Sequence, residues 1–146
     1  MKKIIKVTLF VLLAAAMLAA VGCSSFSEEG TEIISASEAL DLLDRDDIVV
    51  VDAQGSDAYA QNHVEGAVNI ARDDIVVNEP VVNLLAPKEQ IEDAMGAKGV
   101  SNESTVVVYD NNNNMDAARL WWTLKVYGHD QVKVVSGGLN ALTEAG

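Results

Sequence analysis

The sequence predicts an α/β domain whose central, mainly parallel sheet is covered by helices on both faces. Two runs of largely β-branched residues, 48–51 and 105–109, are continuously apolar or nearly so, as in strands buried on both faces. Segments with helical patterning separate these runs from each other and from a third apolar run at 132–135. Because strands that alternate with helices form parallel sheets, a three-layer arrangement follows.

The first half of the domain begins with a helix signal. Ser35 and Glu38 have the spacing of a capping box, and Leu40, Leu42 and Leu43 supply an apolar face, so a short helix starts there. The next predicted elements are a strand at 48–51, a polar helix near 57–61, a turn with a short strand over 63–70, and a mostly irregular loop over 72–86.

The second half repeats the alternation with longer helices. Pro87 is predicted at the first position of a helix that Gly96 or Gly99 ends. After it come a strand at 105–109, a polar loop at 110–114, the longest helix at 115–127 closed by Gly128, a strand at 132–135, a glycine turn at 137–138 and a terminal helix at 139–144. In such sheets ligands bind beyond the carboxyl ends of the strands, which points to residues 110–115.

Residues 1–22 have the pattern of an export signal and stand outside the domain. Lys2, Lys3 and Lys6 precede a 15-residue run from Val7 to Val21 that only Thr8 interrupts. A helix that crosses a bilayer needs about 20 apolar residues, so this run fits a removable signal better than a permanent span.

Cys23 is the single cysteine of the chain, so no internal disulfide can form. The preceding Ala20, Val21 and Gly22 resemble the lipobox of bacterial lipoproteins, which implies acylation of Cys23 and anchoring at the extracytoplasmic face of a bacterial membrane. Residues 23–31 would then be a polar tether, and 32–146 the domain. The alternative is an ordinary signal peptide that ends beside an accidental cysteine.

The charge of the chain excludes one class of partner. The net charge is −12, and removal of the signal takes three of ten basic residues but none of the 22 acids, which leaves 7 minus 22, or −15. No basic stripe is present to neutralise phosphates, so the sequence predicts no nucleic-acid partner. The acidity indicates a solvated surface.

Five motifs occur in order along the domain, and they are Val49–Ala53, His63–Asn69, Thr105–Asp110, Ala118–Trp122 with Tyr127–His129, and Gly137–Leu139. Together they resemble a rhodanese-like (sulfurtransferase) domain, and most closely the N-terminal half of the tandem-domain thiosulfate sulfurtransferases. The resemblance covers residues 33–146. It implies the three-layer rhodanese fold, with Gln54 standing where that family commonly has arginine.

Asp110 decides what the resemblance implies about activity. In catalytic rhodanese domains a cysteine ends this strand, and backbone N–H groups around it stabilise the thiolate that carries sulfur as a persulfide. A carboxylate offers only hard oxygen, so no catalytic residue is expected in this chain. Asp110 is predicted instead to cap the long helix and to complement its dipole. The residues equivalent to the active-site loop are Asp110, Asn111, Asn112, Asn113, Asn114 and Met115.

Other interpretations of this loop fit less well. An EF-hand needs glycine and glutamate where Met115 and Trp121 stand, and an aspartyl phosphatase needs a second aspartate where Asn112 stands. The asparagines are typical turn residues. With two histidines, His63 and His129, and no cysteine beside them, the sequence predicts no metal site and no cofactor.

Five more residues are predicted to be structural or to lie at an interface. Arg119 is expected to pair with a buried acid such as Asp52, with anion binding as the alternative. Trp121 and Trp122 project about 100° apart on one helix, so one is expected in the core and the other at an interface. His63 is expected to be structural.

Three functions remain open on the sequence. The first is a non-catalytic rhodanese domain that pairs with a catalytic rhodanese domain, in the same longer chain or a separate polypeptide, which moves sulfane sulfur from thiosulfate to a thiophilic acceptor. The second is a stand-alone lipid-anchored binding module without enzymatic activity. The third is an independent enzyme that acts through Asp110.

Overall fold

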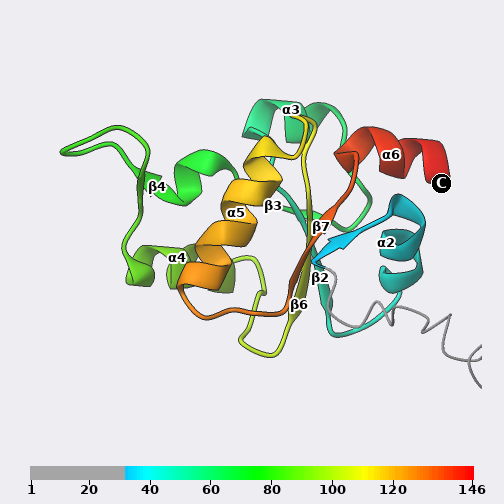
Figure 1. The fold of residues 1–146 in the computed structure, drawn as a ribbon, viewed down its shortest axis with the longest axis horizontal. Helices are drawn as coiled ribbons and strands as arrows, with labels where there is room; N and C mark the ends of the chain where they lie inside the picture. The colour runs from blue at the N-terminus through cyan, green and yellow to red at the C-terminus, as the bar shows by residue number, and fades with distance from the viewer. Residues whose placement is uncertain (1–31) are drawn as a thin grey trace, which may run out of the picture. The chain divides into compact units, whose positions relative to one another are not determined.

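The computed structural model describes residues 32–146, which form one α/β unit (Figure 1). The predicted signal (residues 1–22), Cys23 and the tether that ends at residue 31 all lie outside the described residues. Within 32–146, no helix has the length and hydropathy that crossing a membrane would require.

Five parallel strands form the central sheet, in the order β1-β7-β6-β2-β3. β6 lies at the centre, with Val108 level with Val51 of β2 and with Val134 of β7. The strands are β1 (Ile33–Ile34), β2 (Ile48–Asp52), β3 (Val68–Asn69), β6 (Thr105–Tyr109) and β7 (Val132–Val135).

Helices cover both faces of this sheet, as the sequence predicts. The helices are α2 (Ala36–Leu42), α3 (Ser56–Gln61), α4 (Lys88–Gly96), α5 (Met115–Val126) and α6 (Gly138–Ala145). Figure 1 shows α4 and α5 on one side of the strands and α2 and α6 on the other. The α/β fold with a mainly parallel sheet is therefore confirmed.

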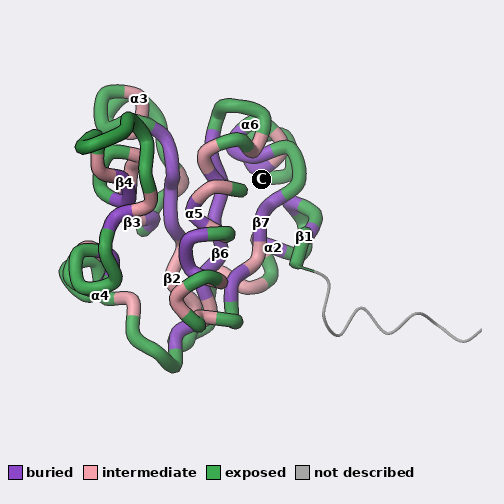
Figure 2. The backbone as a smooth tube through the Cα atoms, turned by 60° about the vertical axis from the view of Figure 1, so that its left-hand side comes forward, coloured by how far each residue is buried: buried purple, intermediate pink, exposed green. Residues whose placement is uncertain are grey.

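Alternate residues of β6 point to opposite faces and build two cores. Val106 and Val108 pack in one core with residues of α4 and α5, whereas Val107 and Tyr109 pack in the other with residues of α2 and α6. Figure 2 shows the buried stretches along the strands and exposed residues on the outer sides of the helices. Because β6 is buried on both faces, its residues do not alternate between polar and apolar along the strand.

The segment 72–86 is more ordered than the sequence predicts. It holds a 3₁₀ turn, η1 (Arg72–Asp74), and two antiparallel strands, β4 (Val76–Val77) and β5 (Leu84–Leu85). The loop between these strands turns at Asn83, whose φ is 64°. Two-residue strands are too short to show a periodic pattern, and β1 escapes prediction for the same reason.

Helix boundaries differ from prediction by one residue at several ends. Pro87 precedes α4 as its N-cap, and Tyr127 follows α5 as its C-cap. The capping box at the start of α2 is present, because the Ser35 hydroxyl accepts from the Glu38 N–H at 3.2 Å and the Glu38 carboxylate accepts from the Ser35 N–H at 2.7 Å.

Candidate functional site

Asp110 directly follows the last residue of β6, at the carboxyl edge of the sheet. Its side chain is 1% exposed, since α5 and the turn before α6 enclose it. The loop 111–114 then reverses the chain into α5. The fold thus places this carboxylate where parallel sheets hold their ligands.

Four backbone N–H groups donate to the Asp110 carboxylate. Oδ1 accepts from Asn112 and Asn114, both at 2.9 Å. Oδ2 accepts from Asp116 at 2.8 Å and from Ala117 at 2.9 Å. The last two donors belong to the first turn of α5, whose N–H groups have no partner within the helix. We call these four donors the amide cradle; the carboxylate fills it as a helix cap would.

Two consecutive asparagines give the loop its curl. Asn113 and Asn114 have φ values of 54° and 63°, the left-handed region that asparagine tolerates better than most residues. The Asn114 side-chain N–H donates to the Val135 carbonyl at 3.0 Å, and that of Asn112 donates to the Asp116 carboxylate at 3.1 Å. The asparagine run therefore shapes and fastens the cradle.

The other wall of the site comes from the turn between β7 and α6. The Leu139 N–H donates to the Asp110 backbone carbonyl at 2.8 Å. A shallow pocket of about 260 Å³ remains above the carboxylate. Its lining residues are Asp110, Asn111, Asn113, Asn114, Gly137 and Asn140. Apart from Gly137, this lining consists of one carboxylic acid and four side-chain amides. The pocket is therefore polar, and no cationic side chain lines it.

Arg72 is a residue of this region that sequence analysis missed. Its Nε donates to the Asp116 carboxylate at 2.7 Å, and its Nη2 donates to the Met115 carbonyl at 3.2 Å. The guanidinium thereby fastens η1 to the first turn of α5. The two partners lie 44 residues apart, and no local motif signals such a contact.

Comparison with known proteins identifies the family. The family model described as "Rhodanese-like domain" matches residues 35–145. The chain belongs to the rhodanese-like family. Asp110 and its amide cradle therefore lie in the loop that follows β6 of a rhodanese-like domain. This loop, residues 110–115, is the one that the sequence analysis identifies as equivalent to the active-site loop.

Curated relatives of this rhodanese-like domain are named as thiosulfate sulfurtransferases. One from Mycobacterium leprae is 34% identical over 108 residues, covering 73% of this chain and 38% of the relative. One from Haloferax volcanii is 36% identical over 103 residues, covering 68% of this chain and 35% of the relative. The chain thus spans little more than a third of the length of these relatives.

Solved structures show the same fold. A 3-mercaptopyruvate sulfurtransferase from Leishmania major superposes with a TM-score of 0.72 at 28% identity, over 81% of this chain and 35% of that one. SseA from Escherichia coli superposes with a TM-score of 0.71 at 26% identity, over 79% of this chain and 48% of that one. Both are similar to the rhodanese-like domain described here.

Arg119 does not make the ion pair with Asp52 that the sequence suggests. Its Nη2 donates to the Asn83 carbonyl at 3.0 Å, and its guanidinium lies 5.0 Å from the ring centre of Trp122. Asp52 is held by Gln54, whose backbone N–H and side-chain N–H donate to the carboxylate at 2.8 and 2.6 Å. In this rhodanese-like domain Gln54 lies two residues from Asp52 and supplies hydrogen-bond donors to its carboxylate. Arg119 bonds to the 78–83 loop instead.

The two tryptophans of α5 have different surroundings. Trp121 is partly buried and packs against the core between α4 and α5, with Lys125 Nζ 5.9 Å from its ring centre. Trp122 is 42% exposed, beside Arg119. Trp121 thus lies on the inner side of α5 and Trp122 on its exposed side; the place of Trp122 at an interface stays a prediction.

His63 follows α3 and contacts Tyr59 of that helix. Its ring stacks on Tyr59 at a centroid separation of 4.0 Å, and Nδ1 lies 2.8 Å from the Tyr59 carbonyl. The Tyr59 hydroxyl donates to the Ala67 carbonyl at 2.6 Å. These contacts join α3 to the strand that follows it.

Tyr109 links the site strand to the same region. Its hydroxyl accepts from the Val64 N–H at 2.9 Å. Burial raises the pKa of the Tyr109 phenol strongly, and the Asp52 carboxylate beside it raises that pKa further. Within residues 32–146, no three His, Cys, Asp or Glu side chains gather in a way that could hold a metal ion.

Proposed function

We propose that this chain is the non-catalytic domain of a thiosulfate sulfurtransferase system and pairs with a catalytic rhodanese domain. The observation that carries the proposal is the filling of the amide cradle by the Asp110 carboxylate. In the catalytic partner, a cysteine thiolate attacks the outer sulfur of thiosulfate, sulfite leaves, and the resulting persulfide passes its sulfur to a thiophilic acceptor. The only cysteine here is Cys23, which precedes the domain.

Two physical arguments oppose sulfur transfer at Asp110 itself. A carboxylate oxygen is a hard nucleophile and forms no stable counterpart of a persulfide. Its charge would also repel each unit of negative charge on a thiosulfate dianion at about 4 Å by roughly 1–4 kcal/mol, depending on exposure. Both oxygens of Asp110 are already occupied by two amide donors each.

An exposed apolar stripe on α5 supports pairing with another domain. Met115, Trp122 and Val126 are 58%, 42% and 49% exposed, and their spacing puts them on one side of the helix. Arg119 lies between them and ties the stripe to Asn83. The adjoining loop adds further exposed apolar side chains, which are Val81, Val82 and Leu84. Contiguous apolar surface of this kind marks protein interfaces.

The length of the relatives is compatible with such a pair. The chain covers 35–38% of the matched thiosulfate sulfurtransferases, so those proteins have room for a second domain. We propose that the catalytic domain packs on the α5 stripe, beside the Asp110 loop, and that this domain adds stability and one wall of the cleft.

The proposal includes export and anchoring. The lipobox-like sequence before Cys23 supports acylation of that thiol and attachment to the extracytoplasmic face of a bacterial membrane. Mass spectrometry of the protein made in a bacterial host should find a diacylated cysteine at the new N-terminus. Cys23→Ser should leave the protein unacylated and release it from the membrane fraction; an unmodified Cys23 would contradict the anchoring.

A cyanide and thiosulfate assay tests the catalytic part of the proposal. The mature chain alone should give no thiocyanate above the uncatalysed rate, and no persulfide mass should appear after incubation with thiosulfate. Turnover by the chain alone would overturn the proposal and favour an enzyme that acts through Asp110.

A binding experiment tests the pairing. The DNA after codon 146 should encode a rhodanese domain with a cysteine in the Asp110-equivalent loop, and that domain, expressed separately, should form a complex with this chain in sedimentation. Trp122→Ala should weaken the complex, whereas His63→Ala, which alters a side chain that stacks on Tyr59 of α3, should leave it unchanged. Failure of the two domains to associate would favour the stand-alone binding module, whose ligand would occupy the 260 Å³ pocket beside Asp110.

A further inference from the structure

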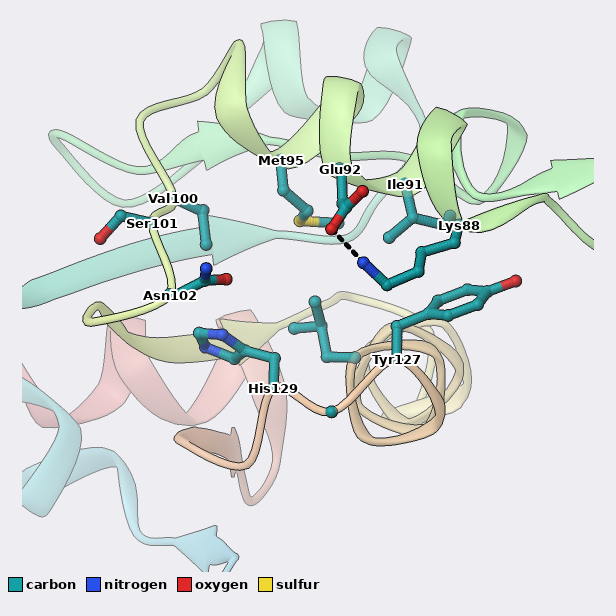
Figure 3. Close-up of a pocket in the computed structure, with 11 residues that line it drawn as sticks. Lys88, Ile91, Glu92, Met95, Val100, Ser101, Asn102, Tyr127 and His129 are labelled. Carbon is teal, nitrogen blue, oxygen red and sulfur yellow. Dashed lines mark hydrogen bonds and ion pairs between the residues drawn. The ribbon is translucent and has the colours of Figure 1, made fainter.

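A second pocket lies at the opposite end of the sheet from Asp110. It is lined by residues that precede β6 and β7, whereas Asp110 follows β6. Its volume is about 610 Å³, within the range of about 300–1,000 Å³ typical of small-molecule sites. Figure 3 shows it between α4 and the segment that ends α5. No step proposed for sulfur transfer uses it.

One wall of this pocket is apolar. Ile91 and Met95 of α4 face Leu124 of α5, and these side chains are 2%, 5% and 3% exposed. Val100 and the ring of Tyr127 extend the wall. The Tyr127 hydroxyl donates to the Ala86 carbonyl at 2.6 Å, so it is committed to the fold. This wall suits an aromatic or branched aliphatic body.

The polar end of the pocket holds an unmet hydrogen bond. The Nε2 atom of His129 is buried and has no hydrogen-bond partner among the described residues. Figure 3 shows its ring near the Asn102 side chain, with Lys88 and Tyr127 toward the other end. Buried polar atoms of folded proteins are nearly always paired, so Nε2 has a hydrogen bond to offer to a water or to a ligand group.

The charges around the pocket do not favour an ion. Lys88 and Glu92 are its charged lining residues, and they form an ion pair with each other. No unpaired cation of the lining therefore remains to hold an anionic ligand. A hydroxyl can both donate and accept, so it can satisfy Nε2 in either tautomer of the imidazole.

We propose that this pocket binds a small, neutral, amphipathic molecule with a hydroxyl head. Its apolar body packs on Ile91, Met95 and Leu124, and its hydroxyl bonds to Nε2 of His129. The proposal is independent of the proposed sulfurtransferase pairing, because the two sites lie at opposite ends of the strands.

Three matched probes test the proposal by NMR on the isotope-labelled mature chain. The probes are p-cresol, toluene, which lacks the hydroxyl, and p-toluate, which is anionic. Titration with p-cresol should shift the backbone amides of Ser101, Asn102 and Gly128 in a saturable way. Toluene should bind about three- to tenfold more weakly, since it leaves Nε2 unpaired, and p-toluate should be weaker than p-cresol.

Two histidine variants separate the hydrogen bond from the shape of the pocket. His129→Phe keeps a planar ring but removes Nε2, so p-cresol and toluene should bind it equally. His63→Phe, which alters the other histidine, should keep the preference for p-cresol. Absence of localised shifts with p-cresol, equal binding of p-cresol and toluene by the unaltered chain, or a preference that survives in His129→Phe would each overturn the proposal. The probe comparison on the unaltered chain decides the matter even if His129→Phe does not fold.

Discussion

Gly138 lies against the backbone carbonyl of Asp110 so closely that a Cβ at position 138 would stand 2.1 Å from that oxygen. Gly138 also has a φ of 56°, in the region that side chains disfavour. We therefore expect Gly138→Ala to push the turn before α6 away from the Asp110 loop. The expected loss is about 2–4 kcal/mol in the free energy of unfolding, measured by urea denaturation.

Gly66→Ala is the matched control for that substitution. Gly66 has a φ of 80°, but a Cβ there would meet nothing within 4 Å. Its cost should be about 1 kcal/mol, from backbone strain alone. Equal losses in the two variants would show that contact with Asp110 is not what requires glycine at 138.

The Asp110 carboxylate should stabilise the loop through its four amide donors. Asp110→Ala leaves those N–H groups without their acceptor, and we expect the free energy of unfolding to fall by about 2–4 kcal/mol. Asp110→Asn keeps one carbonyl oxygen and should cost about 1–2 kcal/mol. Asp57→Asn, an exposed acid in the first turn of α3, should change stability by less than about 0.5 kcal/mol. An Asp110→Ala variant with an unchanged free energy of unfolding would contradict a stabilising role of the amide cradle.

The same cradle should activate a thiol. In a Cys23→Ser background, Asp110→Cys places sulfur among the four N–H donors, so the pKa of the thiol should fall below the usual value of about 8.5. The pH dependence of alkylation by iodoacetamide reports that pKa. Asn111→Cys, one residue along and exposed, should react as an ordinary thiol. Identical profiles for the two thiols would mean that the donors do not stabilise an anion at 110.

Tyr109 should make the protein sensitive to alkaline pH. Burial and Asp52 raise the pKa of its phenol in the folded state, so the contribution to stability is complete below the unfolded pKa of about 10. As the pH rises above that value, only the unfolded state releases the proton, and stability falls by up to about 1.4 kcal/mol per pH unit. Urea midpoints above pH 10 should therefore drop more steeply for the unaltered protein than for Tyr109→Phe. Parallel slopes would contradict a raised pKa.

The sequence predicts the fold because its strongest patterns are local. The apolar runs of β2 and β6 and the capping box of α2 depend on neighbours a few residues away, and each lies where its pattern indicates. The two-residue strands β1, β4 and β5 carry too few side chains for any period, and their pairing is set by distant partners.

The candidate site is predictable only in part, for the same physical reason. The place of Asp110 follows from the strand before it and the helix after it. The Arg72 bond to Asp116 and the Arg119 bond to Asn83 depend on how the 72–85 segment packs, which no short-range pattern encodes. The expected Arg119–Asp52 pair fails because Gln54 already satisfies Asp52 from two residues away.

The carboxylate at the end of β6 leaves no thiol among the amide donors of this loop to be oxidised. A thiolate in the same place could be oxidised successively to sulfenic, sulfinic and sulfonic acid, and each added oxygen would crowd the surrounding N–H groups. An aspartate already presents its oxygens to them and has no further oxidation state to reach. Peroxide that would oxidise a thiolate at this position should leave the hydrogen bonds of the Asp110 carboxylate unchanged.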